Sequence, residues 1–325
     1  MEGLGRSFIM INIEQEISKL DWNREPRGLY EPIGYTLESG GKRLRPQLAM
    51  LASEIFGGKD EDVLPAALAL EVFHNFTLLH DDVMDRADVR RGRPTVHVRW
   101  NDNTAILSGD QMLIEAYKLL SGVPAGKLPE VLRLFNKMGT EICEGQQYDV
   151  DFEAKADTTI DDYLMMIRLK TSVLLATALQ IGACIAGADN GAQDALYQYG
   201  INLGLAFQIQ DDILDCWGDP ATFGKAIGGD IMCNKKTYVL LTAMKMADPA
   251  TLLELEHWLQ AIHAPKEDKI HAVTVLYNRL GVQKVCEQVV EQYTRRALEC
   301  LNTLPQNDST QALRALAGKL TNRTK

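Results

Sequence analysis

The chain has 325 residues, of which 46% are hydrophobic and 24% charged, which is typical of a globular protein large enough for a substantial core. Its net charge of −10 argues against a nucleic-acid partner. Its six cysteines show no CxxC spacing, which favours reduced thiols over a disulfide framework or a zinc site. We therefore expect a cytoplasmic protein.

No segment has the pattern of a signal peptide or a membrane span. Residues 1–10, MEGLGRSFIM, lack the basic and long apolar regions of a signal, and Met10 offers a second start, so these residues can be an extension. The longest uncharged run, residues 172–188, is short for a span and contains Ser, Thr, Gln and Gly. We predict a buried core helix there and no integral membrane segment.

Residues 39–46, SGGKRLRP, combine a glycine turn with three basic side chains. Pro46 favours the first turn of a helix, and the QLAMLASEIF that follows is amphipathic. Lys42, Arg43 and Arg45 would then lie near a helix N-terminus, which attracts anions. The segment predicts a phosphate site, and the alternative is an exposed basic turn.

An aspartate-rich motif, LLHDDVMDRADVRRGRP, follows an apolar stretch with helical spacing. In a helix Asp81 and Asp85 lie on one face, with Cβ atoms roughly 6 Å apart, while Asp82 is turned away. Such a pair suits a hard divalent cation such as Mg²⁺. The arginines at 90 and 91 suit a phosphate-rich ligand. Alone, the motif could equally be a solvated acidic helix end before a basic loop.

The aspartate pattern recurs in the second half of the chain. Residues 207–219, FQIQDDILDCWGD, repeat the DDxxD spacing after another apolar helical run. Its aspartates are Asp211, Asp212 and Asp215. Basic residues again follow the motif, namely Lys225, Lys235 and Lys236. We interpret the two motifs as carboxylates on two helices that line one cavity, with metal ions between them.

Apolar residues keep a helical spacing through much of the chain, as in residues 64–80, 130–142, 159–179 and 282–301. Gly and Pro clusters separate these stretches, and there is no sustained strand pattern, GxGxxG loop or long linker. We predict an all-α fold in a single domain, residues 1–325.

Seven motifs in this order resemble those of the trans-isoprenyl diphosphate synthases, the family of the farnesyl and geranylgeranyl diphosphate synthases. They are GGKRLRP, LLHDDVMDRADVRRGRPTVH, AILSGDQML, GQQYD, RLKTS, GLAFQIQDDILD and GKAIGGDIMCNKKTY. The resemblance implies an antiparallel helical bundle around a deep central cavity, usually a homodimer. It also implies a prenyltransferase that joins isopentenyl diphosphate head-to-tail to an allylic diphosphate, with Mg²⁺ as cofactor, about three ions per site.

The resemblance also assigns roles to individual residues. It implies four Mg²⁺ ligands: Asp81, Asp85, Asp211 and Asp215. It implies contacts to the allylic diphosphate from Arg90, Lys170, Thr171, Gln208, Lys225 and Lys235. It implies contacts to isopentenyl diphosphate from Lys42, Arg45, His74 and Arg91.

Residues one or two turns before Asp81 are expected to set the length of the product. Phe76 and Thr77 stand five and four positions before Asp81, and Phe73 stands one turn earlier. In the family, aromatics at both nearer positions give short products, whereas Thr77 here is small. A helical wheel nevertheless puts Phe73 and Thr77 nearer the aspartate face than Phe76. Fifteen or twenty carbons fit best, and plain core packing is the alternative for each Phe.

Three other readings remain open. A class I terpene cyclase shares one DDxxD helix, but it needs neither a second motif nor the SGGKRLRP site. A di-iron helical bundle uses ExxH motifs, which occur here at Glu71–His74 and Glu254–His257. A non-catalytic subunit could keep the fold, although the aspartates of both motifs are intact.

Overall fold

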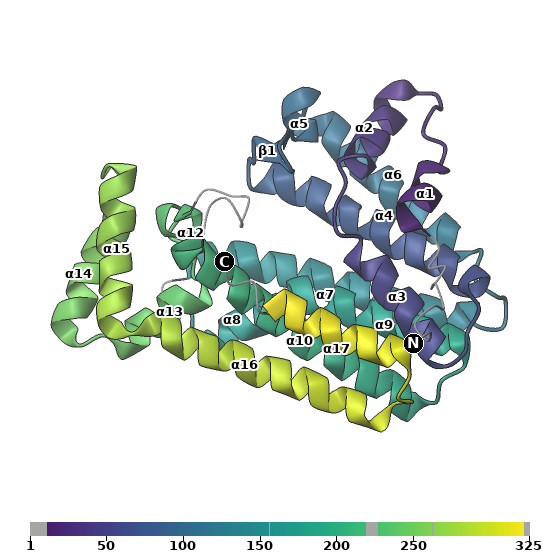
Figure 1. Ribbon diagram of the computed structural model, residues 1–325. Coiled ribbons are helices and arrows are strands. Elements are labelled where there is room, and N and C mark those ends of the chain that lie inside the picture. Colours follow the sequence, from purple (N-terminus) through teal and green to yellow (C-terminus); the bar gives the residue numbers. More distant parts are fainter. Residues whose placement is uncertain (1–11, 156, 219–226, 262, 322–325) are drawn as a thin grey trace, which may run out of the picture. The chain divides into compact units, whose positions relative to one another are not determined.

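The prediction of an all-α fold is confirmed by the computed structural model, which describes residues 12–155, 157–218, 227–261 and 263–321 (Figure 1). The contacts between Cα atoms divide the chain into two compact units. Unit 1 is Met1–Leu134 with Ala178–Gln193, and unit 2 is Phe135–Thr177 with Asp194–Lys325. The single domain of residues 1–325 and its deep central cavity stay predictions, and residues 1–10 lie outside the described residues.

Unit 1 contains the first six helices and a two-stranded hairpin. The helices are α1 (Ile13–Ser18), α2 (Arg27–Leu37), α3 (Leu44–Ile55), α4 (Asp60–Met84), α5 (Val96–Arg99) and α6 (Asp102–Leu120). The strands are β1 (Val89–Arg90) and β2 (Arg93–Pro94), which pair antiparallel. Pro46 lies in the first turn of α3, as predicted.

Three long helices run from one unit into the other: α7 (Leu128–Ala154), α9 (Val173–Ala186) and α10 (Asn190–Trp217). Among the described residues, the helical elements that lie wholly in unit 2 are α8 (Ile160–Ile167), η1 (Arg168–Ser172), α12 (Gly229–Met232), α13 (Tyr238–Met246), α14 (Pro249–Gln260), α15 (Lys266–Leu280), α16 (Val282–Cys300), η2 (Leu301–Thr303) and α17 (Asp308–Thr321).

The core of unit 1 is built on α4, a helix of 25 residues that packs against α3 and α6. Its middle, residues 66–73, is buried on every side, and it ends in the first aspartate motif. The acidic residues of its first turn, Asp60, Glu61 and Asp62, suit the positive end of the helix dipole. A rigid, buried helix therefore presents the carboxylates that follow it.

The continuous helical run Ile160–Ala186 contains one turn of a different kind. Residues Arg168–Ser172, the RLKTS motif, form the π-helix η1 between α8 and α9. The apolar spacing of residues 159–179 predicts a helix but not this wider turn. Single π turns inside α-helices frequently lie at functional sites.

Two helical stretches are long and apolar enough to cross a membrane, Asp60–Met84 and Ile160–Ala186. Their most apolar windows are 61% and 78% buried inside the structure, which is what core helices of a globular protein also show. Burial on this scale agrees with the prediction of a core helix at residues 172–188.

Candidate active site

The first aspartate motif lies at the C-terminal end of α4, in unit 1. Asp85 is the C-cap residue, and its backbone N–H donates to the carbonyl of Asp81 at 2.8 Å. Asp81 is half-buried and Asp85 is exposed, so one helical turn presents both carboxylates near the surface. Asp82, in contrast, is buried, and burial raises its pKa.

Arg90 returns to this helix end through a tight hairpin. Its Nε donates to Asp82 Oδ1 at 2.7 Å, and its Nη2 lies 3.7 Å from Asp81 Oδ2. The hairpin turn is made by Arg91 and Gly92, which both have positive φ, the geometry of a type I′ turn. The turn therefore sends Arg90 and Arg91 to different partners.

Arg91 contacts the SGGKRLRP loop. Its guanidinium donates to the Ser39 hydroxyl at 3.2 Å and to the carbonyl of Gly40. Burial, together with the charges of nearby arginines that include Arg45 and Arg91, lowers the pKa of His74 well below its usual range. The structure thus brings together Arg45, His74 and Arg91 of the predicted isopentenyl diphosphate site, while Lys42 lies exposed in the same loop.

The two arginines of the SGGKRLRP segment, Arg43 at the N-cap of α3 and Arg45 in its first turn, have different surroundings. Arg43 is 4% exposed and forms ion pairs with Glu71 at 2.9 Å and Glu14 at 2.8 Å. Arg45 has a buried Nε without a hydrogen-bond partner among the described residues, and burial lowers its pKa to about 10. An orphaned buried donor beside His74 fits the prediction that Arg45 meets an anion, whereas Arg43 holds the loop in place.

The glutamates of the two ExxH pairs, which a di-iron bundle would use as metal ligands, form ion pairs and hydrogen bonds with other side chains. The Glu71 carboxylate accepts from Arg43 and from the Asn75 amide at 3.0 Å. Glu254 pairs with Arg279 at 2.7 Å. Among the described residues, no group of three or more His, Cys, Asp or Glu side chains is arranged to hold a metal ion. This geometry gives no support to an iron site at either pair.

In unit 2 the π-helix η1 meets α10. The Thr171 hydroxyl donates to Gln208 Oε1 at 3.4 Å, and Lys170 Nζ donates to Asp149 Oδ2 at 2.6 Å. Gly145 makes this packing possible, because a Cβ there would lie 2.7 Å from the carbonyl carbon of Leu169. The structure therefore brings together Lys170, Thr171 and Gln208.

The second aspartate motif lies near the end of α10. Asp211 is half-buried, whereas Asp212 and Asp215 are buried. Asp212 accepts from the Tyr163 hydroxyl at 2.5 Å and from the Tyr238 backbone N–H at 2.9 Å. Burial and the nearby Asp230 carboxylate raise its pKa to about 7. Asp211 is thus the most accessible of the three carboxylates.

The segment that begins at Ile227 contributes Asp230 and Lys235. The backbone N–H of Asp230 donates to Asp215 Oδ2 at 3.0 Å, and the backbone N–H of Lys235 donates to the Asp230 carbonyl at 2.9 Å. Lys236 instead donates to the carbonyls of Phe152 and Lys155, near the end of α7. The predicted Lys225 lies outside the described residues.

The sequence analysis did not single out Asp230 or Tyr163. It did name Lys235 and not Lys236 as a diphosphate contact, and Lys236 binds backbone carbonyls instead. The GGD of GKAIGGDIMCNKKTY was the available signal for Asp230, since a carboxylate there stands next to the predicted lysines. No pattern pointed to Tyr163, because the contact joins residues 49 positions apart.

The predicted chain-length residues lie one to two turns before Asp81. Phe73 is buried, and its ring centroid is 5.4 Å from that of Phe76. Phe76 is half-buried and also contacts the His80 ring at 4.9 Å. The Thr77 hydroxyl donates to the His74 carbonyl at 2.8 Å. All three roles stay predictions.

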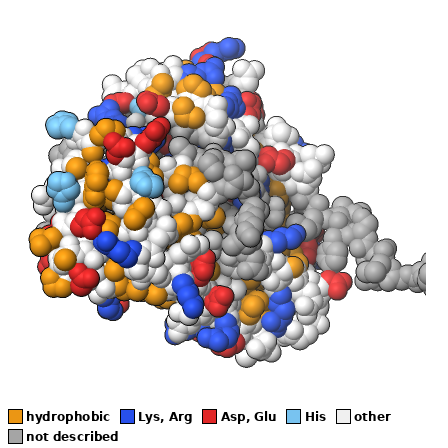
Figure 2. Space-filling view, turned by 60° about the vertical axis from the view of Figure 1, so that its left-hand side comes forward, with side chains coloured by type: hydrophobic (Ala, Val, Ile, Leu, Met, Phe, Trp, Pro, Cys, Tyr) orange, Lys and Arg blue, Asp and Glu red, His pale blue; other side chains and the backbone are white. Residues whose placement is uncertain are grey.

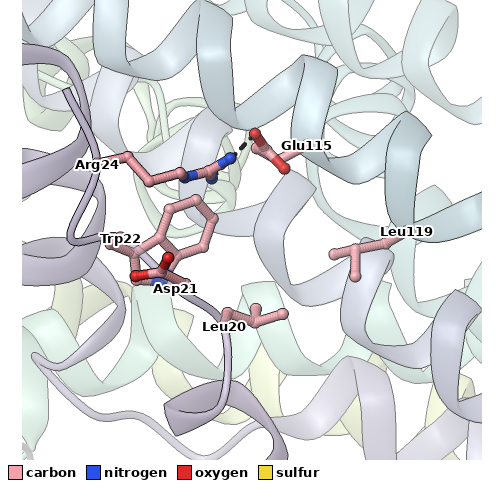
Figure 3. A pocket seen from close by; sticks show the side chains of 6 residues that line it. All are labelled: Leu20, Asp21, Trp22, Arg24, Glu115 and Leu119. Atoms are coloured by element: carbon pink, nitrogen blue, oxygen red, sulfur yellow. Dashed lines mark hydrogen bonds and ion pairs between the residues drawn. The ribbon is translucent and has the colours of Figure 1, made fainter. Parts of the chain in front are cut away.

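A separate pocket of about 230 Å³ lies between the segment before α2 and helix α6 (Figure 3). Arg24 Nη2 donates to Glu115 at 3.1 Å (Figure 3), and the guanidinium stacks over the Tyr30 ring, while the buried Arg24 Nε has no hydrogen-bond partner among the described residues. The lining residues are Leu20, Asp21, Trp22, Arg24, Glu115 and Leu119. None of them is a predicted site residue, and we interpret the pocket as part of the anchor of the N-terminal segment on α6.

Histidine side chains also lie on the surface, as Figure 2 shows for one face of the molecule. His257, His263 and His271 are exposed. They contribute nothing to either aspartate motif that the structure describes.

The donors at the two motifs fit Mg²⁺. This ion prefers oxygen ligands and usually binds through one or two carboxylates, with waters and substrate phosphates completing its shell. Asp81 and Asp85 offer such a pair within one helical turn, and Asp211 offers a third accessible carboxylate. The two motifs lie in different units, so the cavity that they are predicted to share stays a prediction.

An all-α fold with a DDxxD motif near the end of each of two long helices, one beside a cluster of arginines, defines a class of diphosphate-binding helical proteins. Residues 26–276 match the family model described as polyprenyl synthetase. The chain therefore belongs to the polyprenyl synthetase family, and its assignment as a prenyltransferase is confirmed.

Two relatives illustrate the similarity. The geranylgeranyl diphosphate synthase of Methanosarcina mazei is 42% identical over 236 residues, which cover 72% of this chain and 73% of the relative. The geranylfarnesyl diphosphate synthase of Natronomonas pharaonis is 37% identical over 319 residues, which cover 93% of this chain and 92% of the relative.

Solved structures agree with the sequence comparison. A crystal structure of a geranylgeranyl pyrophosphate synthase matches with a TM-score of 0.91 at 44% identity, covering 96% of this chain and 97% of that one. The synthase of that name from Corynebacterium glutamicum, crystallised with isoprenyl diphosphate and magnesium, matches with a TM-score of 0.86 at 29% identity, covering 96% of this chain and 97% of that one.

Proposed function

We propose that the protein condenses isopentenyl diphosphate with an allylic diphosphate to give a short-chain trans-prenyl diphosphate, with twenty carbons the best-supported length. The observation that carries the proposal is the cluster of Arg45, His74 and Arg91, which lies on the helix and loops that also present Asp81 and Asp85. The relatives named geranylgeranyl diphosphate synthase support the length.

The reaction needs one polar bond to break and one carbon–carbon bond to form. The allylic carbon–oxygen bond breaks, and its electron pair leaves on diphosphate. The double bond of isopentenyl diphosphate then attacks the allylic carbon, and a proton passes from the adduct to the released diphosphate. Fixed positive charge where negative charge accumulates is usually among the largest catalytic terms.

Residues of both units have roles in this proposal. Mg²⁺, held by Asp81 and Asp85 and by Asp211 with Asp215, would neutralise the diphosphate oxygens, and about three ions would suffice. The side chains predicted to hold the allylic diphosphate are Arg90, Lys170, Lys225 and Lys235. The Thr171 hydroxyl and the Gln208 carbonyl, 3.4 Å apart, are polar groups that can stabilise the allylic cation without capturing it.

The isopentenyl diphosphate would bind at Lys42, Arg45, His74 and Arg91. Guanidinium groups grip phosphate in a bidentate manner, and a neutral His74 can donate one further hydrogen bond. Holding the second substrate beside the first supplies the proximity that the condensation requires. From the family resemblance we also infer a homodimer in the cytoplasm.

The test is an incubation with Mg²⁺, isopentenyl diphosphate and dimethylallyl, geranyl or farnesyl diphosphate. Products are sized after phosphatase treatment, and Asp81→Asn serves as the control for the metal motif. Linear geranylgeraniol, absent without Mg²⁺ and with Asp81→Asn, is the expected result. Cyclic hydrocarbons would favour the terpene cyclase, and no turnover with any starter would favour a non-catalytic subunit.

A further inference from the structure

Lys269 on α15 is a buried ammonium that the proposed reaction does not use. Only 1% of its surface is exposed, and burial lowers its pKa. The one hydrogen bond of its Nζ among the described residues runs to Asn234 Oδ1, at 2.8 Å. A buried ammonium group without a carboxylate partner is costly in free energy. The hydrogen bond to Asn234 is therefore expected to have a structural role.

Asn234 has an unusual backbone conformation. Its φ is 52°, in the left-handed region, which a residue other than Gly adopts at a cost and Asn more readily than most. Both ends of its side-chain amide are engaged, since Nδ2 donates to the Leu259 carbonyl of α14 at 2.9 Å and Oδ1 accepts from Lys269. The side chain is thereby fixed to α14 and α15.

The next residue in the chain is Lys235, which is predicted to contact the allylic diphosphate. Its backbone N–H donates to the Asp230 carbonyl, and the Asp230 N–H donates to Asp215 Oδ2. The left-handed conformation of Asn234 therefore sets the direction of the chain between the end of α12 and the lysines Lys235 and Lys236.

The same helix holds the other end of this segment. Gly228 has a φ of 79°, and a Cβ there would lie 2.6 Å from Ile270 Cδ1, so α15 packs closely against its backbone. Adjacent residues of α15, Lys269 and Ile270, thus contact the two left-handed positions that bracket the segment from Gly228 to Asn234.

We propose that Lys269 is a positioning residue for the allylic diphosphate site: by binding Asn234 it keeps the left-handed turn that aims Lys235 and orders the segment carrying Asp230. Lys269 touches no substrate in this role and acts through Asn234. The kinetic test of this inference rests on the proposed function, whereas the hydrogen-exchange test does not.

The first experiment compares Lys269→Met, which keeps the apolar stem, with Lys266→Met, an exposed lysine in the first turn of the same helix. Lys269→Met is expected to raise the KM for the allylic diphosphate about tenfold, with the KM for isopentenyl diphosphate unchanged. Lys266→Met is expected to match the wild type in both constants.

The second experiment separates backbone conformation from general damage. Asn234→Ala and Asn234→Gly remove the same hydrogen bonds, but only Gly adopts positive φ without strain. Asn234→Ala should therefore raise the allylic KM several-fold more than Asn234→Gly. In the double variant Lys269→Met with Asn234→Gly, the allylic KM should fall below that of Lys269→Met alone.

A third readout needs no turnover. Hydrogen–deuterium exchange of the peptide spanning residues 228–237 should accelerate in Lys269→Met and not in Lys266→Met. Equal allylic KM and equal exchange in these two variants would overturn the proposal, as would equal KM in Asn234→Ala and Asn234→Gly. If Lys269→Met does not fold, the Asn234 pair decides. An inactive wild type would refute the proposed function, while the exchange comparison would still test Lys269.

Discussion

Arg43 and Arg45 are separated by a single residue, yet their side chains meet different groups. Arg43 is buried between Glu14 and Glu71, whereas Arg45 lies beside His74 with an orphaned Nε. The left-handed φ of 44° at Arg43 turns the chain between them. Their substitutions should therefore separate stability from substrate binding.

We expect Arg43→Gln to lower the free energy of unfolding by about 3 kcal/mol, because it leaves the buried Glu71 carboxylate without its cation. Arg45→Gln should leave stability nearly unchanged and raise the KM for isopentenyl diphosphate at least about tenfold. Urea unfolding and initial-rate kinetics measure the two effects. If Arg45→Gln raised both substrate constants equally, its assignment to one diphosphate would be wrong.

His74 predicts a pH dependence of stability in the substrate-free protein. Its folded pKa lies below its unfolded value near 6.5, so below that pH the unfolded chain binds more protons. The contribution of His74 to stability should then fall as the pH drops below about 6.5, by at most about 1.4 kcal/mol per pH unit. Asp212, whose pKa is raised to about 7, acts in the opposite direction over the same range, and it does so equally in the wild type and in His74→Gln. Denaturant unfolding between pH 7.5 and 5.5 should therefore show the wild type losing stability relative to His74→Gln.

The matched control is His271→Gln, since His271 is exposed on α15. This variant should keep the full pH dependence of the wild type. A His74→Gln curve parallel to the wild-type curve would mean that His74 is not the group that resists protonation.

For single residues, the sequence predicted which side chains belong to the site but not which residues they bind. Spacing alone placed Asp81 and Asp85 on one turn, because helix geometry is local. It could not separate Arg43 from Arg45, since the difference comes from Glu14 and Glu71 elsewhere in the chain. Nor could it reveal the partner that holds the buried Asp212, since Tyr163 lies on another helix.

At the scale of secondary-structure elements, the π-helix η1 packs closely against α7 at Gly145. A side chain at Gly145 would collide with the backbone of Leu169 and Lys170, which cannot move aside as a flexible side chain can. We expect Gly145→Ala to lower stability by about 1–3 kcal/mol and to reduce turnover with the allylic substrate by displacing Lys170 and Thr171. Thermal unfolding and steady-state kinetics measure both.

Gly28→Ala in α2 is the comparison, because no atom lies within 4 Å of its added Cβ. It should be neutral or stabilising by about 0.4–1 kcal/mol. Equal behaviour of the two Gly→Ala variants would refute the role of the close helix approach.

Helix α4 also carries the prediction on product length. Thr77→Phe adds a ring one turn before Asp81 and should shorten the main product. Phe76→Ala removes the ring that packs against His80 and should lengthen it by one or more five-carbon units, if Phe76 forms the floor. Chromatographic sizing of the dephosphorylated products measures both. Unchanged lengths in both variants would assign these residues to core packing.

The elements themselves were largely predictable from their apolar spacing. The exceptions have physical reasons. The hairpin β1–β2 has only two residues per strand and depends on a turn with two positive φ values, which leaves no alternating pattern. The π turn of η1 is set by the packing of Gly145 and Gly204 against it, which a single stretch of sequence cannot reveal.

At the scale of the whole molecule, helix α6 has an exposed apolar face that could form the interface of the expected homodimer. Ile106, Leu107, Ile114 and Tyr117 are exposed and fall within about 100° of the helix circumference, a face that Asn103 and Asp110 share. An apolar stripe of this kind is typical of an interaction surface. We expect Ile114→Glu to shift the protein from dimer to monomer in light scattering at micromolar concentration.

Leu253→Glu is the control, since Leu253 is an exposed apolar residue on α14. It should leave the dimer intact. A wild-type monomer, or two variants that dimerise alike, would contradict the prediction. This surface could not be predicted from the sequence, because the spacing of α6 by itself does not say which apolar residues the core leaves uncovered.

The π-helix within Ile160–Ala186 also bears on how such a site can arise. A π turn contains one residue more than an α turn, so the helix before it and the helix after it are offset by the rotation of one residue, about 100°. Both α8 and α9 keep their buried faces, and the surplus residue is accommodated in RLKTS alone. A single inserted codon is enough to create such an offset. The apolar sequence on either side could therefore be inherited unchanged while Lys170 and Thr171 acquired a new direction.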